Sequence, residues 1–297
     1  MLKSVIIPAL NEAENLTRNL PQVRAQLAPA DELLVIDNGS SDESAAAAAK
    51  CGAEVIHELV RGRSQARNAG IRRARSEILV FLDADCTPQA GWLAELLKPF
   101  ENPSIGCVAG AIQTIGTGTP FSNYLVNKGH LAQSVYFEHP FHPYAATGNA
   151  AFRRAVLERI GFFDEALWAG HDADLSWRMQ LETTYKIAAA PLAIVSHKQD
   201  LSFNGFLKQK RRHAQGAVLL YKKYQHYRQA EVASFKEIYW EYRSIGKRGF
   251  DCLAQLLAAR LGLKSSLDLD QQYQLVIELG EKLGRIEGSI RNHVWYP

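Results

Sequence analysis

The chain has 297 residues, of which 47% are hydrophobic and 22% charged, an ordinary composition for one large globular domain with a smaller addition. Its four cysteines lie far apart and form no CxxC pair, so the sequence predicts neither a zinc site nor a disulfide framework. We expect these cysteines to be reduced and mostly buried.

The net charge of +3 is unevenly distributed along the chain. Residues 1–199 contain 18 basic and 21 acidic side chains, whereas residues 200–297 contain 16 and 10. The first part is therefore slightly acidic and the second clearly basic, which predicts that they face different partners.

Two stretches are candidates for a targeting or membrane segment, and neither fits. The N-terminal residues reach Asn11 and Glu12 before any long apolar run, which favours a first strand over a signal peptide. The uncharged stretch 102–127 is interrupted by Gly, Pro, Ser, Thr and Asn, whose polar groups are costly to place in lipid. We expect a cytoplasmic protein, soluble or at most peripheral on the inner face of the membrane.

Short apolar runs alternate with helical patterns in the first half of the chain. Helical segments begin near Asn11, Ser41 and Arg63, and Ser or Asp within residues 40–44 is expected to cap the helix with the alanine run. This alternation predicts right-handed βαβ units on a mainly parallel sheet. The predicted strands are Ser4–Pro8, Glu32–Asp37, Glu54–Glu58 and Ile78–Asp83.

In such a sheet, the loops at the carboxyl ends of the strands form the ligand crevice. Residues 8–12, 37–41 and 83–85 should therefore converge there. After Asp200 the pattern changes to long amphipathic helices over Phe203–Tyr227, Phe235–Leu261 and Gln271–Ile290, with a turn over Gly262–Asp270. We predict an α/β domain over residues 1–199 and a helical extension over residues 200–297.

Two carboxylates, Asp83 and Asp85, stand two residues apart where an apolar strand ends. On an extended strand end they project the same way, and oxygen ligands of this kind suit Mg²⁺ or Mn²⁺ bound to a diphosphate. The alternative is that both cap the segment that follows. Asp37 ends the second predicted strand, where it can meet a ribose hydroxyl, form an Asx-turn, or do both.

These segments, with IIPALNE at residues 6–12 and RGRSQARNAG at residues 61–70, resemble the inverting family 2 glycosyltransferases of the GT-A fold. The resemblance continues in ATGNAAFR at 146–153, GFFDE at 161–165 and GHDADLSWR at 170–178, and so covers about two thirds of the chain. It implies a Rossmann-like, mainly parallel mixed sheet and a hexosyltransferase-type enzyme. Such an enzyme would use a nucleotide-diphosphate donor, with UDP-sugars favoured. Because the sequence shows no membrane spans that could form an export channel, we expect transfer of a single sugar rather than processive synthesis.

The resemblance also implies roles for single residues. Asp172 would be the general base that accepts the proton of the acceptor hydroxyl, so that direct displacement inverts the anomeric centre. Asp85 would be the main ligand of Mn²⁺ or Mg²⁺, and Asp83 would face the ribose. The nucleotide would be surrounded by Pro8, Asn11, Glu12, Asp37 and Arg67, and the sugar and acceptor side would hold Gly148, Asn149 and His171.

Several positions depart from the family pattern or leave a choice open. His171 stands where an acidic residue is usual, so Asp174 is kept as a second candidate base, although it is better placed to cap the following helix. His197 ends a late strand and matches a position that can reach the metal, although a lone histidine is more often structural. The QKRRH sequence at 209–213 is similar to the QxxRW signature of processive members, and Arg212 could contact the diphosphate.

Residues 201–230 contain seven Lys or Arg and no acidic residue, interleaved with apolar side chains. This pattern predicts a helix with one apolar and one cationic face, which could lie on an anionic membrane. The simpler interpretation is that the apolar stripe packs within the protein and Lys208–Arg212 contact the diphosphate or stay solvated.

Other functions remain open. One is a non-catalytic nucleotide-sugar-binding subunit, although Asp85 and Asp172 are both present; another is a sugar nucleotidyltransferase, which the absence of glycine in residues 8–12 disfavours. Nucleic-acid binding is disfavoured because an acidic crevice repels phosphate. The sequence leaves open whether the acceptor is a glycan, a lipid-linked or a small molecule, and whether residues 231–297 support a homodimer.

Overall fold

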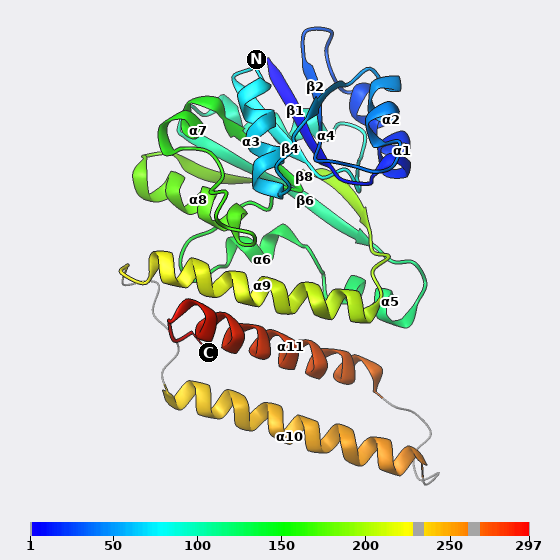
Figure 1. Ribbon diagram of the computed structural model, residues 1–297, viewed down its shortest axis with the longest axis vertical. Helices are drawn as coiled ribbons and strands as arrows, with labels where there is room; N and C mark the ends of the chain where they lie inside the picture. The colour runs from blue at the N-terminus through cyan, green and yellow to red at the C-terminus, as the bar shows by residue number, and fades with distance from the viewer. Residues whose placement is uncertain (1, 228–234, 261–267, 297) are drawn as a thin grey trace. The chain divides into compact units, whose positions relative to one another are not determined.

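The computed structural model describes residues 2–227, 235–260 and 268–296 (Figure 1). It divides into two compact units. The sheet unit comprises residues 1–116 and 128–199, and the helical unit comprises residues 117–127 and 200–297. The predicted division at residue 199 was thus wrong for Thr117–Asn127, which belongs to the helical unit.

The sheet unit is built on eight strands among the described residues, in the order β3-β2-β1-β4-β7-β6-β8-β5. Parallel pairs join β1 to β2 and β4, β2 to β3, and β6 to β8, whereas β7 and β5 pair antiparallel with their neighbours. The sheet is therefore mixed and mainly parallel. The strands are β1 Lys3–Ala9, β2 Glu32–Asp37, β3 Glu54–His57, β4 Ile78–Leu82, β5 Cys86–Pro88, β6 Ile105–Ile115, β7 Asn149–Arg153 and β8 Lys186–Lys198.

Helices cover both faces of this sheet. The first face packs against α1 (Ala13–Arg24), α2 (Ser44–Lys50) and α4 (Trp92–Leu97), with η1 (Lys98–Glu101) next in the chain. The second packs against α3 (Arg63–Arg73), α7 (Arg154–Ile160) and α8 (His171–Glu182), and α6 (Gln133–Phe137) adds Phe137 at its edge. Alternate side chains of one strand enter opposite cores, which is why fully apolar runs form the central strands.

The loop after β2 caps two helices at once. The N-cap residue of α2 is Glu43, and Asp42 Oδ1, one residue earlier, accepts the Ser44 N–H at 3.0 Å and so satisfies a free donor at the start of α2. The other oxygen, Oδ2, accepts the Ala13 N–H at 3.1 Å, and Ser44 Oγ accepts the Glu12 N–H at 2.7 Å. Because these contacts satisfy donors at the start of α1, they tie the loops after β1 and β2 together.

The helical unit contains α5 (Pro120–Asn127), α9 (Phe203–Tyr224), α10 (Phe235–Arg260) and α11 (Leu269–Asn292). The rings of Phe121, Phe206 and Tyr273 meet edge to face at 5.1–5.2 Å, which explains why α5 belongs here. The helix predicted to Tyr227 ends at Tyr224. Residues 228–230 of the predicted basic helix, Leu261 and most of the predicted turn, residues 262–267, lie outside the described residues.

Helices α9 and α11 pack closely because α11 presents small residues to α9. A Cβ atom on Gly280 would lie 2.4 Å from Leu207, and one on Gly284 would lie 2.3 Å from the Arg211 carbonyl oxygen. On the other side of α11, Leu275 packs with Ile245 and Cys252 of α10. In the described part of the chain, no helix combines the length and apolar character that crossing a bilayer requires.

Candidate active site

The loops after β1, β2 and β4 converge at one edge of the sheet, as the sequence predicts. Asn11 has a left-handed backbone (φ 59°), and its side-chain oxygen accepts the Ser41 N–H at 2.8 Å. Burial raises the pKa of Glu12, and the nearby carboxylates of Asp85 and Asp83 raise it further. Glu12 therefore lies near the Asp83–Asp85 segment, and this edge of the sheet gathers negative charge that favours a cation.

Asp37 sits at the end of β2 and organises the turn that follows. Its Oδ1 accepts the Ser40 N–H at 3.0 Å, and its Oδ2 accepts a hydrogen bond from His57 Nδ1 at 3.1 Å. Burial opposes ionisation, but the bonds from Ser40 and His57 lower the pKa of Asp37. The turn-forming role is thus present, and the ribose contact remains a prediction. Pro8 lies half-buried within β1, one residue before its end.

Arg67 links the loop after β4 to the start of α8. Its Nη2 donates to Asp83 Oδ1 at 2.8 Å, and its Nη1 donates to His171 Nε2 at 3.0 Å. The arginine side chain is 3% exposed, so α3 must be held against the sheet for this link to form. Gly70 allows α3 to pack closely on the sheet, because a Cβ atom at this position would lie 2.4 Å from the Ile6 side chain.

The contact with Arg67 also defines the state of His171. A guanidinium has only donors, so His171 Nε2 must act as an acceptor and the ring proton lies on Nδ1. Burial and the Arg67 charge lower the pKa of His171, which keeps the ring neutral near pH 7. His171 therefore adds no acid to the crevice, unlike the residue usual at this position.

Asp172 follows at the first turn of α8 and is 28% exposed. Thr147 Oγ1 donates to Asp172 Oδ1 at 2.6 Å, and His171 Nε2 lies 3.5 Å from the same oxygen. Burial would raise the pKa of Asp172, whereas a charge on His171, the Arg67 charge and the Thr147 hydroxyl lower it. Because His171 is neutral near pH 7, Arg67 and Thr147 are the groups that keep the pKa low there. The carboxylate is thus ionised near neutral pH, fixed by one oxygen and accessible to a reactant.

Asp85 and His197 meet because β5 pairs antiparallel with β8. Cys86 lies opposite His197 in that pairing, which brings His197 Nε2 to 3.2 Å from Asp85 Oδ2. Asp85 is 41% exposed, so the pair is open to a ligand. The expected extended strand end was wrong: β4 stops at Leu82, and residues 83–86 form a turn closed by Cys86 N–H and the Asp83 carbonyl at 3.0 Å.

The donor set of Asp85 and His197 fits a divalent ion. Two ligands about 2.1 Å from one ion at a right angle are about 3.0 Å apart, close to the observed 3.2 Å. Among the described residues no group of three or more His, Cys, Asp or Glu side chains forms a complete metal site. The pair therefore suits an ion that draws its other ligands from a diphosphate and water, and the imidazole favours Mn²⁺ over Mg²⁺.

Two predicted site residues turn out to be structural. Asn149 is fully buried: it accepts from Trp92 Nε1 at 2.7 Å and donates to the carbonyls of Ala111 and Ala193, both at 2.8 Å, so its side chain is not on the sugar side. Asp174 does not cap α8, which begins after Gly170. It lies in the first turn of α8, is fully buried and pairs with Arg178 at 2.9 Å, which favours Asp172 over Asp174 as the base.

Gly148 lies against the carboxylate of Asp83, since a Cβ atom there would be 3.2 Å from Asp83 Oδ2.

The sequence analysis did not single out two further residues of the site, Arg63 and Thr147. Arg63, the first residue of α3, is exposed and close enough to lower the pKa of both Asp85 and Asp172. Thr147 holds Asp172. Both residues lie inside the motifs that carry the family resemblance, and this position is the only feature of the sequence that could have indicated a role for them.

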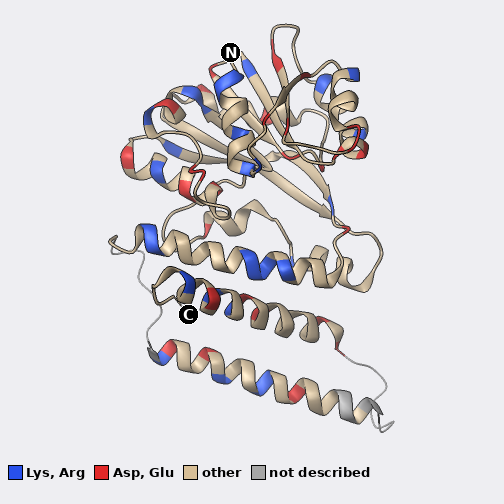
Figure 2. Cartoon of the chain, in the orientation of Figure 1, with Lys and Arg blue, Asp and Glu red and all other residues tan. Residues whose placement is uncertain are grey.

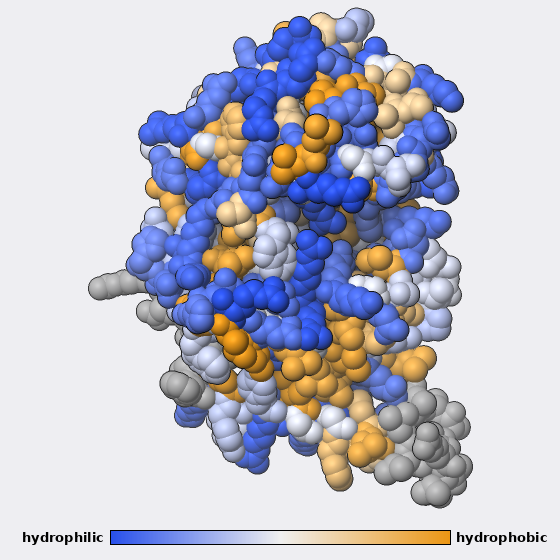
Figure 3. Space-filling model, in the orientation of Figure 1, coloured by the Kyte–Doolittle hydropathy of each residue, from blue (hydrophilic) through white to orange (hydrophobic). Residues whose placement is uncertain are grey.

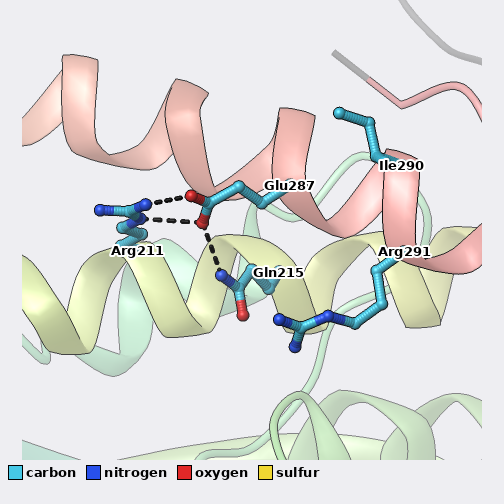
Figure 4. Close-up of a pocket in the computed structure, with 5 residues that line it drawn as sticks. All are labelled: Arg211, Gln215, Glu287, Ile290 and Arg291. Carbon is cyan, nitrogen blue, oxygen red and sulfur yellow. Dashed lines mark hydrogen bonds and ion pairs between the residues drawn. The ribbon is translucent and has the colours of Figure 1, made fainter.

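The cations of α9 belong to the helical unit, so the predicted diphosphate contact of Arg212 stays a prediction. Figure 2 shows Lys and Arg along this helix. Two of the cations in Lys208–Arg212 form ion pairs on the surface: Lys210 lies 3.3 Å from Glu281, and Arg211, whose side chain is 48% exposed, forms a two-pronged ion pair with Glu287. Figure 4 shows that pair, with Gln215, at an open pocket of about 530 Å³ between α9 and α11.

Sequence comparison identifies relatives for most of the chain. The profile of glycosyl transferase family 2 matches residues 4–161. The chain is 28% identical over 216 residues to the pre-mycofactocin glycosyltransferase of Mycobacterium tuberculosis, covering 70% of this chain but only 45% of that protein. It is 29% identical over 232 residues to glycosyltransferase AglE of Haloferax volcanii, covering 72% of each.

Solved structures share the fold. A mannosyltransferase from Pyrobaculum calidifontis, in complex with GDP-Man and Mn²⁺, superimposes with a TM-score of 0.64 at 21% identity, covering 96% of this chain and 86% of the other. Glucosyl-3-phosphoglycerate synthase from Mycobacterium tuberculosis, with Mg²⁺ and UDP, gives 0.54 at 19% identity, covering 73% and 78%. These matches confirm the predicted mainly parallel sheet flanked by helices.

Proposed function

Because this chain belongs to glycosyl transferase family 2, we propose that it transfers a single sugar from a nucleotide-diphosphate donor to an acceptor hydroxyl. The observation that carries the proposal is that a candidate metal-binding pair and a candidate general base lie at the same edge of the sheet. One is the Asp85–His197 pair, which fits a divalent ion; the other is Asp172, an ionised and accessible carboxylate.

The donor is held by the loops after β1, β2 and β4. Asn11, Glu12 and Asp37 line the nucleotide end, and the buried Arg67 fixes Asp83 toward the ribose. A divalent ion at Asp85 and His197 supplies charge neutralisation for the leaving diphosphate. Arg63 adds a positive charge at the same edge and supports phosphate binding.

Asp172 acts on the acceptor. Thr147 holds one carboxylate oxygen, which leaves the other to accept the proton of the attacking hydroxyl. A direct attack on the anomeric carbon inverts its configuration. Neutral His171 lies 3.5 Å from Oδ1, the oxygen that Thr147 holds. An acidic residue at position 171 would place a second negative charge beside Asp172, so a neutral histidine helps to keep the base ionised.

UDP-sugars are our first choice of donor. The similarity to solved proteins bound to UDP with Mg²⁺ and to GDP-Man with Mn²⁺ supports both a nucleotide diphosphate and a divalent ion. We place the protein in the cytoplasm, where nucleotide sugars are the donors for such enzymes.

Thermal unfolding with a panel of donors tests the proposal. UDP-, GDP-, dTDP- and CMP-sugars are compared with Mn²⁺, Mg²⁺ or EDTA, because a ligand of the native state raises its stability by mass action. We expect a metal-dependent shift with one nucleotide class, lost in Asp85→Asn and kept in Asp251→Asn, a matched exposed control on α10. If a donor raises the melting temperature equally in the presence of EDTA, the metal assignment is overturned. Donor binding without turnover would favour a non-catalytic subunit.

A further inference from the structure

Helix α10 has apolar side chains on two sides. Ile245 and Cys252 are buried against α11. Tyr239, Tyr242, Phe250 and Leu253 are 59%, 37%, 72% and 55% exposed, and at 100° per residue they fall within an arc of about 80°. The exposed arc is centred about 110° away from the buried pair. Packing on α11 therefore accounts for one apolar side of α10 and leaves the other uncovered.

Helix α11 continues the uncovered surface. Leu279, Leu283 and Ile290 are 42%, 51% and 72% exposed and are spaced four and seven residues apart, so they form one stripe. Figure 3 shows apolar side chains gathered over α10 and α11 on the face drawn. Single exposed apolar residues are ordinary, but a set of seven on two adjoining helices marks an interaction surface.

The charges beside this surface are positive. Lys236, Arg243 and Lys247 are exposed on α10, and the Arg243 guanidinium lies over the Trp240 ring at 5.0 Å. Of the acidic side chains of α10, Glu241 accepts from Lys282 of α11 at 2.6 Å. Glu237 and Asp251 are exposed, but at 100° per residue they lie about 140–180° from the centre of the exposed apolar arc, farther from it than the three cations. Cations with Trp, Tyr and Phe beside an apolar stripe are the composition of a helix that lies at a membrane interface.

We propose that the exposed face of the α10–α11 hairpin binds the surface of an anionic lipid bilayer. An anionic surface complements Arg243 and Lys247, whereas a symmetric dimer would bring the same cations of two copies together. We place the contact on α10 and α11 rather than on the basic helix α9. Its apolar residues Phe206 and Val218 are buried, and Lys210 and Arg211 are paired with α11.

Flotation of the full chain with vesicles tests this surface. We compare vesicles of phosphatidylcholine alone with vesicles that also contain phosphatidylglycerol. The unmodified chain should float only with the anionic vesicles, and added salt should release it. Arg243→Gln with Lys247→Gln should lower the partition coefficient roughly thirtyfold, since each cation near such a surface contributes about a factor of five. Phe250→Ser with Leu253→Ser should abolish flotation.

Matched controls lie in the sheet unit. Arg24→Gln with Lys50→Gln removes two exposed cations, and Leu192→Ser removes an apolar side chain that is 67% exposed; both should float like the unmodified chain. Circular dichroism verifies that each variant is folded. The proposal is overturned if the unmodified chain does not float, if the controls lose binding equally, or if light scattering shows a dimer that Phe250→Ser with Leu253→Ser dissociates.

Discussion

The sheet unit and the helical unit use their apolar residues differently. In the sheet unit, both faces of the central strands are covered by helices, and polar side chains gather where the strands end. In the helical unit, α10 buries one apolar side against α11, and α11 packs against both α9 and α10, yet each of the two helices exposes a further apolar side. Complete burial gives a rigid frame for the crevice, whereas incomplete burial indicates that the second unit meets a surface outside the chain.

The crevice itself gives the largest expected effect. Replacing Asp172 by Asn should lower turnover by about 10²–10⁴-fold while leaving donor affinity unchanged, because only the proton acceptor is lost. Steady-state kinetics and donor calorimetry measure the two quantities. Asp174→Asn is the control: it breaks the buried pair with Arg178 and should destabilise the sheet unit, but folded protein should keep its turnover. If folded Asp174→Asn lost turnover and Asp172→Asn kept it, Asp174 would be the base.

The frame of the crevice is tested by Asn149→Ala. The change leaves the Trp92 indole N–H and the carbonyls of Ala111 and Ala193 without their buried partner, which should cost about 3 kcal/mol of unfolding free energy. Urea unfolding measures it, with Asn204→Ala on the exposed side of α9 as the control. A small effect would show that the buried network does not hold β6, β7 and β8 together.

The stability of the helical unit should depend on the close contact between α9 and α11. Gly284→Ala places a methyl group against the Arg211 backbone and should destabilise the unit by about 1–3 kcal/mol. Gly246→Ala on α10 meets nothing within 4 Å and should be neutral or raise helix stability by about 0.5–1 kcal/mol. Equal effects of the two substitutions in thermal unfolding would show that α11 does not pack on α9 through its glycines.

The smallest effect concerns acid stability of the sheet unit. Burial would raise the pKa of Glu32, but hydrogen bonds from Ser4 and Arg75 lower it to about 2. The folded pKa is below the unfolded value, so this stabilisation is present above about pH 4.5 and is lost as the pH falls toward 2. Glu32→Gln should cost about 1–2 kcal/mol at pH 7 and nothing near pH 2. A pH-independent difference in urea unfolding would contradict this.

Much of the sheet unit could be predicted from local patterns. The apolar runs before Asn11, Asn38 and Asp83 gave strands β1, β2 and β4 within two residues at either end, because central parallel strands are buried on both faces. The same logic placed the loops of the crevice. It did not identify the antiparallel pairing of β5 with β8, since contacts between residues 86 and 197 leave no local pattern.

The sequence alone indicated the family, the first four strands with the helices between them, the helical character of the C-terminal part, and the residue types of the site, since these follow from short motifs and periodicity. Only the tertiary structure decided which of those side chains act there. Asn149 and Asp174 are equally polar in sequence, but both are buried and satisfied, whereas Asp172 and Asp85 stay accessible. Similarly, the amphipathic patterns of α9 and α10 look alike, and packing on α11 decided that α9 is covered while α10 keeps an exposed apolar side. The physical reason is that burial depends on contacts between residues far apart in the chain, and these contacts decide both which carboxylates remain reactive and which apolar faces remain free.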